Sequence, residues 1–390
     1  MIIKKNFFLY IFIIWYTVDI LTSISSEKFL GVPLFQIDRV VSIIVLVFLF
    51  LQIVFFQKYE IAEIILISFI SILVLVVTIK SNSNYLLTLI LFVIASKESD
   101  IDSLISISYR ILLFCLVIIV LLSIINAIPD IQFIRKNIVR HSLGFSHPNI
   151  LGMRVFQCLV LHVYLNRRRY IHCVIISIPT LLFVYHVPNS QSPTILIALL
   201  IIGVGLIGFL ERYNKVHKLM ICLIAAAIVV NLLSIIGCLI NVGKYPQLKE
   251  IDKLLSYRFS MSHIVYSIYG IKLFGQPVYL TTNERIAVGL TGHLYLDNAY
   301  MSMLIKYGVV GYGIFSILFI LTMMFLYKKE QYILLFCFFV YAIYGIMEPA
   351  MYRLTYNTLL IFIGSFVFSK DFREHERKDR IRICFQRNRN

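Results

Sequence analysis

Residues 40–56, VVSIIVLVFLFLQIVFF, form an apolar run of 17 residues without a charged side chain. An α-helix needs about 17–25 apolar residues to cross a bilayer. Similar runs recur along the whole chain, which is 60% hydrophobic and only 14% charged, whereas a soluble domain has roughly 25% charged residues. The sequence therefore predicts an integral membrane protein.

The recurring apolar runs predict an all-α, polytopic fold of twelve spans, and a count of eleven to thirteen also fits the pattern. One run is short, and the tenth is long and contains Gly308, Gly311 and Gly313, which predicts a kink. The predicted spans are residues 6–24, 40–56, 61–79, 85–96, 110–128, 149–165, 170–187, 193–210, 218–240, 299–327, 331–348 and 353–369.

These spans form a single predicted membrane domain, residues 1–369, followed by a basic tail, residues 370–390. Lys and Arg favour cytoplasmic loops, and their distribution places both termini in the cytoplasm and the large loop, residues 241–298, outside. The first apolar run is too long for a signal peptide, so we interpret it as an uncleaved span. The net charge of +16 is explained by topology and lipid headgroups rather than by nucleic acid.

The sequence has no motif for cofactor chemistry in the context that such a motif needs. The seven cysteines form no CxxC pair, and no P-loop, HExxH or GxSxG motif occurs. The GxGxxG string at 203–208 lies inside an apolar run instead of following a strand, and the DxD pair at 100–102 lies in a predicted cytoplasmic loop. The sequence therefore predicts no metal and no nucleotide cofactor.

The large loop contains an apolar stripe at helical spacing over residues 247–269. This pattern predicts one amphipathic helix on the outer surface, ending at Gly270. Arg258 lies at the edge of the stripe, turned toward the membrane or the protein body. The alternative is that Arg258 reaches lipid headgroups.

Two cations lie inside predicted spans. Arg154 is about one and a half turns into the sixth span, where an arginine costs at least ~2.5–3.5 kcal/mol. It either faces a polar substrate cavity or forms a structural ion pair with Asp19. Lys306 lies about two turns into the tenth span. Glu348 and Arg353 flank the last turn and suggest an interfacial ion pair.

Polar residues also gather where the loop re-enters the membrane. His293 and Asp297 are four residues apart and share a face if that segment is helical. The alternative for Asp297 and Asn298 is a helix cap. His147 has the same ambiguity, because Asn149 is a candidate cap for the sixth span.

Several short motifs, taken with their order and spacing, resemble the bacterial O-antigen and capsular polysaccharide polymerases of the Wzy type, which form one group with the O-antigen ligases. The group has ten to fourteen spans and one large external loop. The motifs are GFSHPNILG at 144–152 with Arg154 after it, YR at 257–258, YGIKLFGQ at 269–276, LDNAY at 296–300 and KYG at 306–308.

The resemblance implies an enzyme that joins oligosaccharide repeat units carried on undecaprenyl diphosphate, without nucleotide or metal. Arg258 and Arg154, with Lys306, are expected to bind the departing lipid diphosphate. His293 or Asp297 is expected to take the proton of the acceptor hydroxyl. These assignments follow from the resemblance and from the chemistry of the residues.

Two further expected substrate contacts are His147 and Asn298. Ligases of the group commonly have a His-Asn pair at the end of the loop, whereas here Asp297 precedes Asn298. The expected partners are the lipid-linked oligosaccharide, membrane lipid, a flippase and a chain-length regulator, in the bacterial cytoplasmic membrane. An O-antigen ligase and a lipid-linked oligosaccharide flippase are the alternative functions, and a flippase would place charges along a cavity reaching both leaflets.

Overall fold

The computed structural model describes residues 2–26, 28–29, 31–135 and 137–369. The basic tail expected at 370–390 lies outside these described residues. In the first half of the chain, α1 packs against α2 and α5, and α5 also packs against α6. Its elements are α1 Ile2–Leu21, β1 Lys28–Phe29, β2 Val32–Pro33, α2 Leu34–Leu51, η1 Gln52–Phe56, α3 Ile61–Ser81, α4 Tyr85–Ala95, α5 Ile101–Ile124, β3 Gln132–Arg135, β4 Ile138–His141 and α6 Pro148–Leu165.

The second half completes the bundle, with α7 packed on α8, and with α13 packed on α3, α9 and α14. Its elements are α7 Tyr170–His186, α8 Gln191–Arg212, α9 Val216–Leu239, η2 Val242–Lys244, α10 Pro246–Leu254, α11 Arg258–Tyr269, α12 Thr282–Ala287, α13 Ala299–Lys328, α14 Tyr332–Tyr344, η3 Pro349–Tyr352, η4 Thr358–Ile361 and α15 Phe362–Val367.

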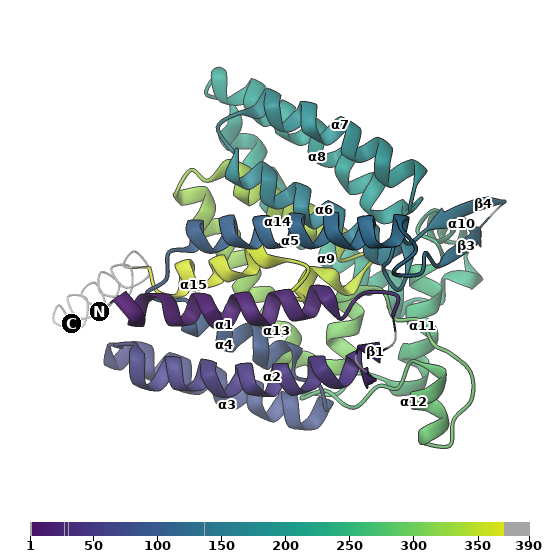
Figure 1. Ribbon diagram of the computed structural model, residues 1–390, viewed down its shortest axis with the longest axis horizontal. Helices are drawn as coiled ribbons and strands as arrows, with labels where there is room; N and C mark the ends of the chain where they lie inside the picture. Colours follow the sequence, from purple (N-terminus) through teal and green to yellow (C-terminus); the bar gives the residue numbers. More distant parts are fainter. Residues whose placement is uncertain (1, 27, 30, 136, 370–390) are drawn as a thin grey trace, which may run out of the picture.

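The bundle has two different ends (Figure 1). One end holds the beginning of α1 and the end of α15, and we call it the terminal end. The opposite end carries the β3–β4 hairpin and the loop helices α10, α11 and α12, and we call it the loop end. The predicted large loop therefore forms a cap on one end of the bundle.

Six helices of the described chain are long and apolar enough to cross a membrane, as in a mostly helical membrane protein. Further apolar helices, α4, α7, α14 and α15 among them, are shorter. The expected count of twelve spans stays a prediction. The six are Leu34–Phe56, Ile61–Ser81, Ile101–Ile124, Gln191–Arg212, Val216–Leu239 and Ala299–Lys328.

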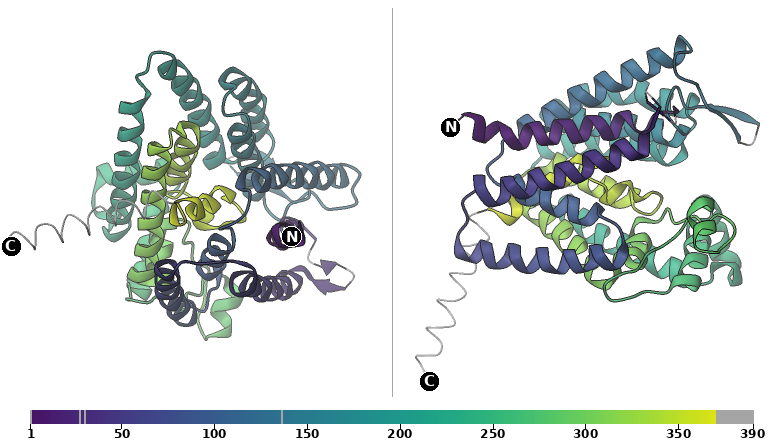
Figure 2. Two further views of the ribbon diagram at one scale, coloured as in Figure 1. Left: turned by 90° about the vertical axis from the view of Figure 1, so that its left-hand side faces the viewer. Right: turned by 60° about the horizontal axis from the view of Figure 1, so that its bottom comes forward.

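The last two predicted spans, residues 331–348 and 353–369, form a short helical hairpin in the centre of the bundle (Figure 2). Its first helix, α14, has 13 residues and rises about 20 Å, less than the roughly 30 Å of a bilayer core. The hairpin tip, residues 345–357, contains η3 and turns instead of α-helix. At membrane depth, such backbone occurs only where protein buries it or where it lines a polar cavity.

The sequence prediction of a single loop helix over 247–269 was wrong in one respect. The chain forms two helices, α10 and α11, because Ser256 and Tyr257 adopt positive φ angles of 54° and 62° between them. The helix end at Gly270 is confirmed, with φ 64°. The fold also contains two small two-stranded sheets that were not expected.

The kink expected in the tenth span is confirmed at Gly308, whose φ of 72° and ψ of −177° interrupt α13. The segment after α11 docks into this interruption, and the N–H groups of Val309 and Val310 donate to the carbonyls of Lys272 and Leu273. A Cβ at Gly308 would lie 2.3 Å from the backbone nitrogen of Gly275. The loop is therefore anchored within the membrane bundle.

Candidate functional site

Arg258 joins three segments that are far apart in the sequence. Its Nη1 forms an ion pair with Asp297, which immediately precedes the Asn298 cap of α13, and its Nη2 donates to Glu348 Oε1 at 3.2 Å. All three side chains are largely buried, with exposed fractions of 15%, 27% and 12%. One guanidinium therefore lies between two carboxylates where the loop meets the hairpin tip.

The orientation of Arg258 follows from the start of α11. Asp252, which is only 1% exposed, accepts hydrogen bonds from the N–H groups of Phe259 at 2.8 Å and Ser260 at 3.2 Å. These are donors that the first turn of a helix leaves unpaired. Because Asp252 caps α11 from the preceding helix, Arg258 faces the protein body. This was one of the two alternatives that the sequence left for Arg258.

Arg353 lies in the hairpin tip, close enough to Glu348 for their charges to interact. Among the described residues, it forms neither an ion pair within 4 Å nor a side-chain hydrogen bond, and its Nε is buried. Its guanidinium stacks over the Tyr85 ring at 4.8 Å. The ion pair expected between Glu348 and Arg353 does not form, because Glu348 binds Arg258 instead.

Arg154 is completely buried and forms an ion pair with Asp19 of α1. Its Nη1 also donates to the backbone carbonyl of Thr355 in the hairpin tip at 2.7 Å, and its guanidinium lies 4.0 Å from the centre of the Tyr356 ring. This geometry favours the structural ion pair over direct substrate contact. Arg154 therefore connects α6 to the hairpin tip through Thr355 and Tyr356.

Asn298 contacts the hairpin tip from the beginning of α13. Its Oδ1 accepts from the N–H of Met301, which makes it the N-cap of α13, and its Nδ2 donates to the carbonyl of Ile346 at 3.2 Å. The N–H of Ala299 donates to Gly345 O at 2.7 Å. Asn298 is fully buried, so it fixes the geometry around Asp297 instead of facing a ligand.

His147 caps α6 rather than Asn149. Its Nδ1 accepts from the N–H of Asn149 at 3.0 Å, while Asn149 itself accepts from Arg140 at 2.5 Å. Burial and the nearby charge of Arg140 hold the pKa of His147 below its ordinary value, which keeps the ring neutral and able to accept. The structure gives His147 a local capping contact.

His293 and Lys306 also form no hydrogen bond or ion pair with the tip within the described part of the chain. His293 is exposed and lies against the Tyr295 ring. The segment before Asn298 is not helical, so His293 and Asp297 do not share a helix face, contrary to one expectation. Lys306 lies close enough to Glu284 for its charge to help lower the pKa of that carboxyl, although burial acts in the opposite direction and hydrogen bonds contribute more.

Of the seven predicted site residues, the structure thus brings Arg258, Asp297, Asn298 and Arg154 to the hairpin tip. Sequence reasoning paired Glu348 with Arg353, and it missed that Glu348 binds Arg258 while Arg353 stacks on Tyr85. The signal was present, because the two charges stand five residues apart in an otherwise apolar stretch. Which partner each one takes depends on contacts with α11 and α4.

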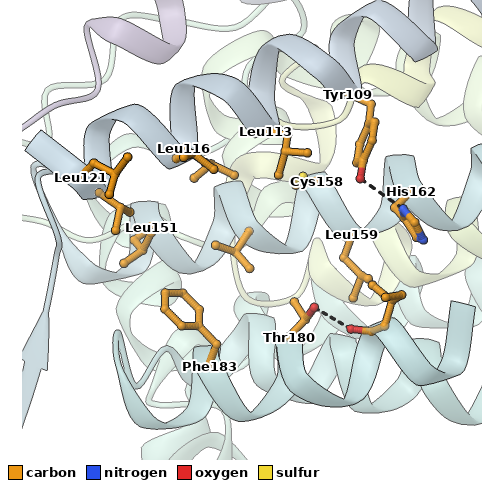
Figure 3. Close-up of a pocket in the computed structure, with 14 residues that line it drawn as sticks. Tyr109, Leu113, Leu116, Leu121, Leu151, Cys158, Leu159, His162, Thr180 and Phe183 are labelled. Carbon is orange, nitrogen blue, oxygen red and sulfur yellow. Dashed lines mark hydrogen bonds between the residues drawn. The ribbon is translucent and has the colours of Figure 1, made fainter.

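A separate cavity of about 440 Å³ lies between α5, α6 and α7 (Figure 3). Its lining is mainly apolar, and the hydrogen bond between Tyr109 Oη and His162 Nδ1 at 3.2 Å marks one end. Leu113 and Leu121 are partly exposed at its edge, so the cavity opens on the surface of the bundle. This lining suits hydrocarbon chains and lacks the charge that a diphosphate requires.

The described residues contain no group of three or more His, Cys, Asp or Glu side chains arranged to hold a metal ion. The site is instead built from arginine, carboxylate and tyrosine side chains. Comparisons of the chain with known protein families, with characterised proteins and with solved structures find no match.

Proposed function

We propose that this protein is a polysaccharide polymerase, which joins oligosaccharide repeat units carried on undecaprenyl diphosphate at the outer face of the bacterial cytoplasmic membrane. The observation that carries the proposal is the ion-paired group Arg258, Asp297 and Glu348, held where the loop meets the hairpin tip. Ionisable residues inside a membrane bundle are costly and usually serve function. The motif resemblance supplies the substrate class.

The reaction needs a base that takes the proton of the acceptor hydroxyl. It also needs a cation that stabilises the negative charge of the departing diphosphate. In the proposed step, the acceptor hydroxyl attacks the anomeric carbon of the donor sugar, and the bond from that carbon to the diphosphate oxygen breaks. The electron pair stays on the diphosphate, and the hydroxyl proton passes to Asp297. No nucleotide or redox partner is needed for the balance.

Asp297 is the better placed of the two predicted bases. It is partly exposed, with 27% of its side chain accessible, and Arg258 fixes its position. His293 has no such support from the tip. Arg258, already between two carboxylates, acts by orienting Asp297.

The test is polymerisation by purified protein in lipid nanodiscs, supplied with undecaprenyl-diphosphate repeat units and no nucleotide. Wild type should produce a ladder of longer chains. Asp297→Asn and Arg258→Ala should lower its rate at least about a hundredfold, the usual contribution of a positioned base.

The matched control is Lys253→Ala, which removes an exposed loop cation and should leave the ladder unchanged. Transfer of a single unit without a ladder would indicate a ligase. No transfer by wild type, or a normal ladder from Asp297→Asn, would contradict the proposal.

A further inference from the structure

Arg353 is the cation of the hairpin tip that forms no ion pair within 4 Å with a described carboxylate, although it lies close enough to Glu348 for their charges to interact. Glu348 and Asp297 both bind Arg258, and Asp19 binds Arg154. The three arginines near the tip therefore differ in the partners that they hold. A guanidinium in a protein interior is costly unless an opposite charge or several acceptors surround it.

The backbone fixes Arg353 firmly, so its free side chain does not reflect a loose segment. Its carbonyl accepts from the N–H groups of Tyr356 at 3.0 Å and Asn357 at 2.8 Å, and its own N–H donates to Ala350. Asn357 Nδ2 in turn donates to Met351 O. The backbone of Arg353 is thus held in place, and its guanidinium forms no hydrogen bond with any side chain or carbonyl of the described residues.

The surroundings of Arg353 are polar on the side of the tyrosines. Tyr85 lies under the guanidinium, and Tyr352, Tyr356 and Tyr307 are close enough to interact with its charge. The hydroxyl groups of Tyr307 and Tyr352 already pair with Ser83 and Ser302. The guanidinium itself is therefore the main candidate for binding an anion, because arginine binds phosphate groups through two parallel hydrogen bonds.

Unpaired polar atoms also concentrate at this place. Within the described residues, Tyr344 Oη, Arg353 Nε and Asn357 Oδ1 are buried without a hydrogen-bond partner, and Arg154 Nε beside the tip has none either. Native proteins leave few such atoms, and those that remain commonly mark functional positions. The hairpin tip therefore places several polar side-chain atoms, free to bind a ligand, inside an apolar bundle.

We propose that Arg353 binds the diphosphate group of a prenyl-linked substrate. The identity of the attached sugar rests on the proposed function, whereas binding of the anion at Arg353 does not. In this arrangement Arg353 receives the negative charge of the departing lipid diphosphate, and the Arg258 group orients the base. This division of roles differs from the sequence expectation, which gave the diphosphate to Arg258 and Arg154.

The experiment measures binding of farnesyl diphosphate to the full chain in phosphatidylcholine nanodiscs, with inorganic pyrophosphate as competitor. Wild type should bind the probe, and Arg353→Gln should weaken binding at least about tenfold, as expected for loss of a charge-assisted pair. Arg353→Lys keeps the charge but not the two parallel donors, and should weaken binding by a smaller factor. The control Arg39→Gln, at an exposed position of α2, should bind like wild type.

Thermal unfolding of each variant shows whether it is folded, and Arg353→Lys supplies the test if Arg353→Gln is not. Unchanged affinity in a folded Arg353 variant, or no binding by wild type, overturns the inference. Displacement of the probe by a small fraction of phosphatidylglycerol in the nanodisc would also overturn it, because the site would then take bulk anionic lipid. If Arg353→Gln loses binding of the probe but the wild-type protein makes no ladder in the polymerisation assay, the inference stands and only the proposed function is contradicted.

Discussion

Asp19 and Arg154 connect α1 to α6 and support the hairpin tip through Thr355. Removing one partner of a buried ion pair leaves an uncompensated charge, which costs about 3–5 kcal/mol, whereas replacing both by apolar groups is often neutral. We therefore expect the fold to depend on each charge having its partner and not on the presence of the two charges as such.

We predict that Asp19→Asn lowers the thermal unfolding temperature markedly, and that the double variant Asp19→Asn/Arg154→Met recovers most of the loss. Unfolding in detergent, followed by circular dichroism, gives the comparison. Additive losses in the double variant would show that the two residues act separately.

His147 gives a residue-scale prediction for pH. Its lowered pKa means that the neutral ring stabilises the fold fully above its unfolded value of about 6.5, and that this contribution is lost as the pH falls through the lower folded value. His147→Asn keeps a capping acceptor that does not titrate. The fall in unfolding temperature between pH 7 and pH 5 should therefore be smaller in this variant, and an identical fall would contradict the assignment.

At the scale of elements, the loop is fixed by its contact with the interrupted helix α13. Gly275 has a φ of 81°, and a Cβ there would lie 2.1 Å from the carbonyl oxygen of Lys306. Gly289 has a similar φ of 76° but no atom within 4 Å of an added Cβ. Substituting each glycine in turn therefore separates the cost of a left-handed backbone, which both share, from the cost of a steric clash, which only Gly275 has.

Gly275→Ala should destabilise the loop much more than Gly289→Ala. Both variants place an L-residue in the left-handed region, at a cost of roughly 1–2 kcal/mol, but only the first also displaces the backbone of α13. Limited proteolysis of the 270–298 segment in nanodiscs measures the effect. Equal cleavage rates in the two variants would mean that the docked segment does not hold the loop.

At the scale of the whole molecule, the beginning of α1 and the end of α15 lie at one end and the loop helices at the other (Figure 1). The basic residues of the sequence predict that the loop end faces the outside. Lys253→Cys in α10, made in a chain without its native cysteines, should react with a membrane-impermeant maleimide on intact cells. Lys215→Cys at the exposed α8–α9 turn should react only after lysis, and the opposite pattern would invert the orientation.

Much of the architecture was predictable, because crossing a bilayer imposes a strong length and composition requirement on each helix. The kink at Gly308 and the helix end at Gly270 were also predictable, since both depend on local backbone freedom. The break between α10 and α11 was not, because the apolar stripe continues through it. The capping contact of Asp252 with the next helix overrides the periodic pattern there.

The order of residues was enough to predict a helical membrane protein with one large loop and with charges set in apolar segments. The packing of the bundle selects which charges meet. Asp297 and Glu348 bind Arg258, Asp19 binds Arg154, and no carboxylate of the described residues forms an ion pair with Arg353. The physical reason is that helix formation and membrane insertion depend on local composition. Ion pairing depends instead on distances of a few ångströms between segments separated by up to 135 residues, which only the packing of the bundle sets.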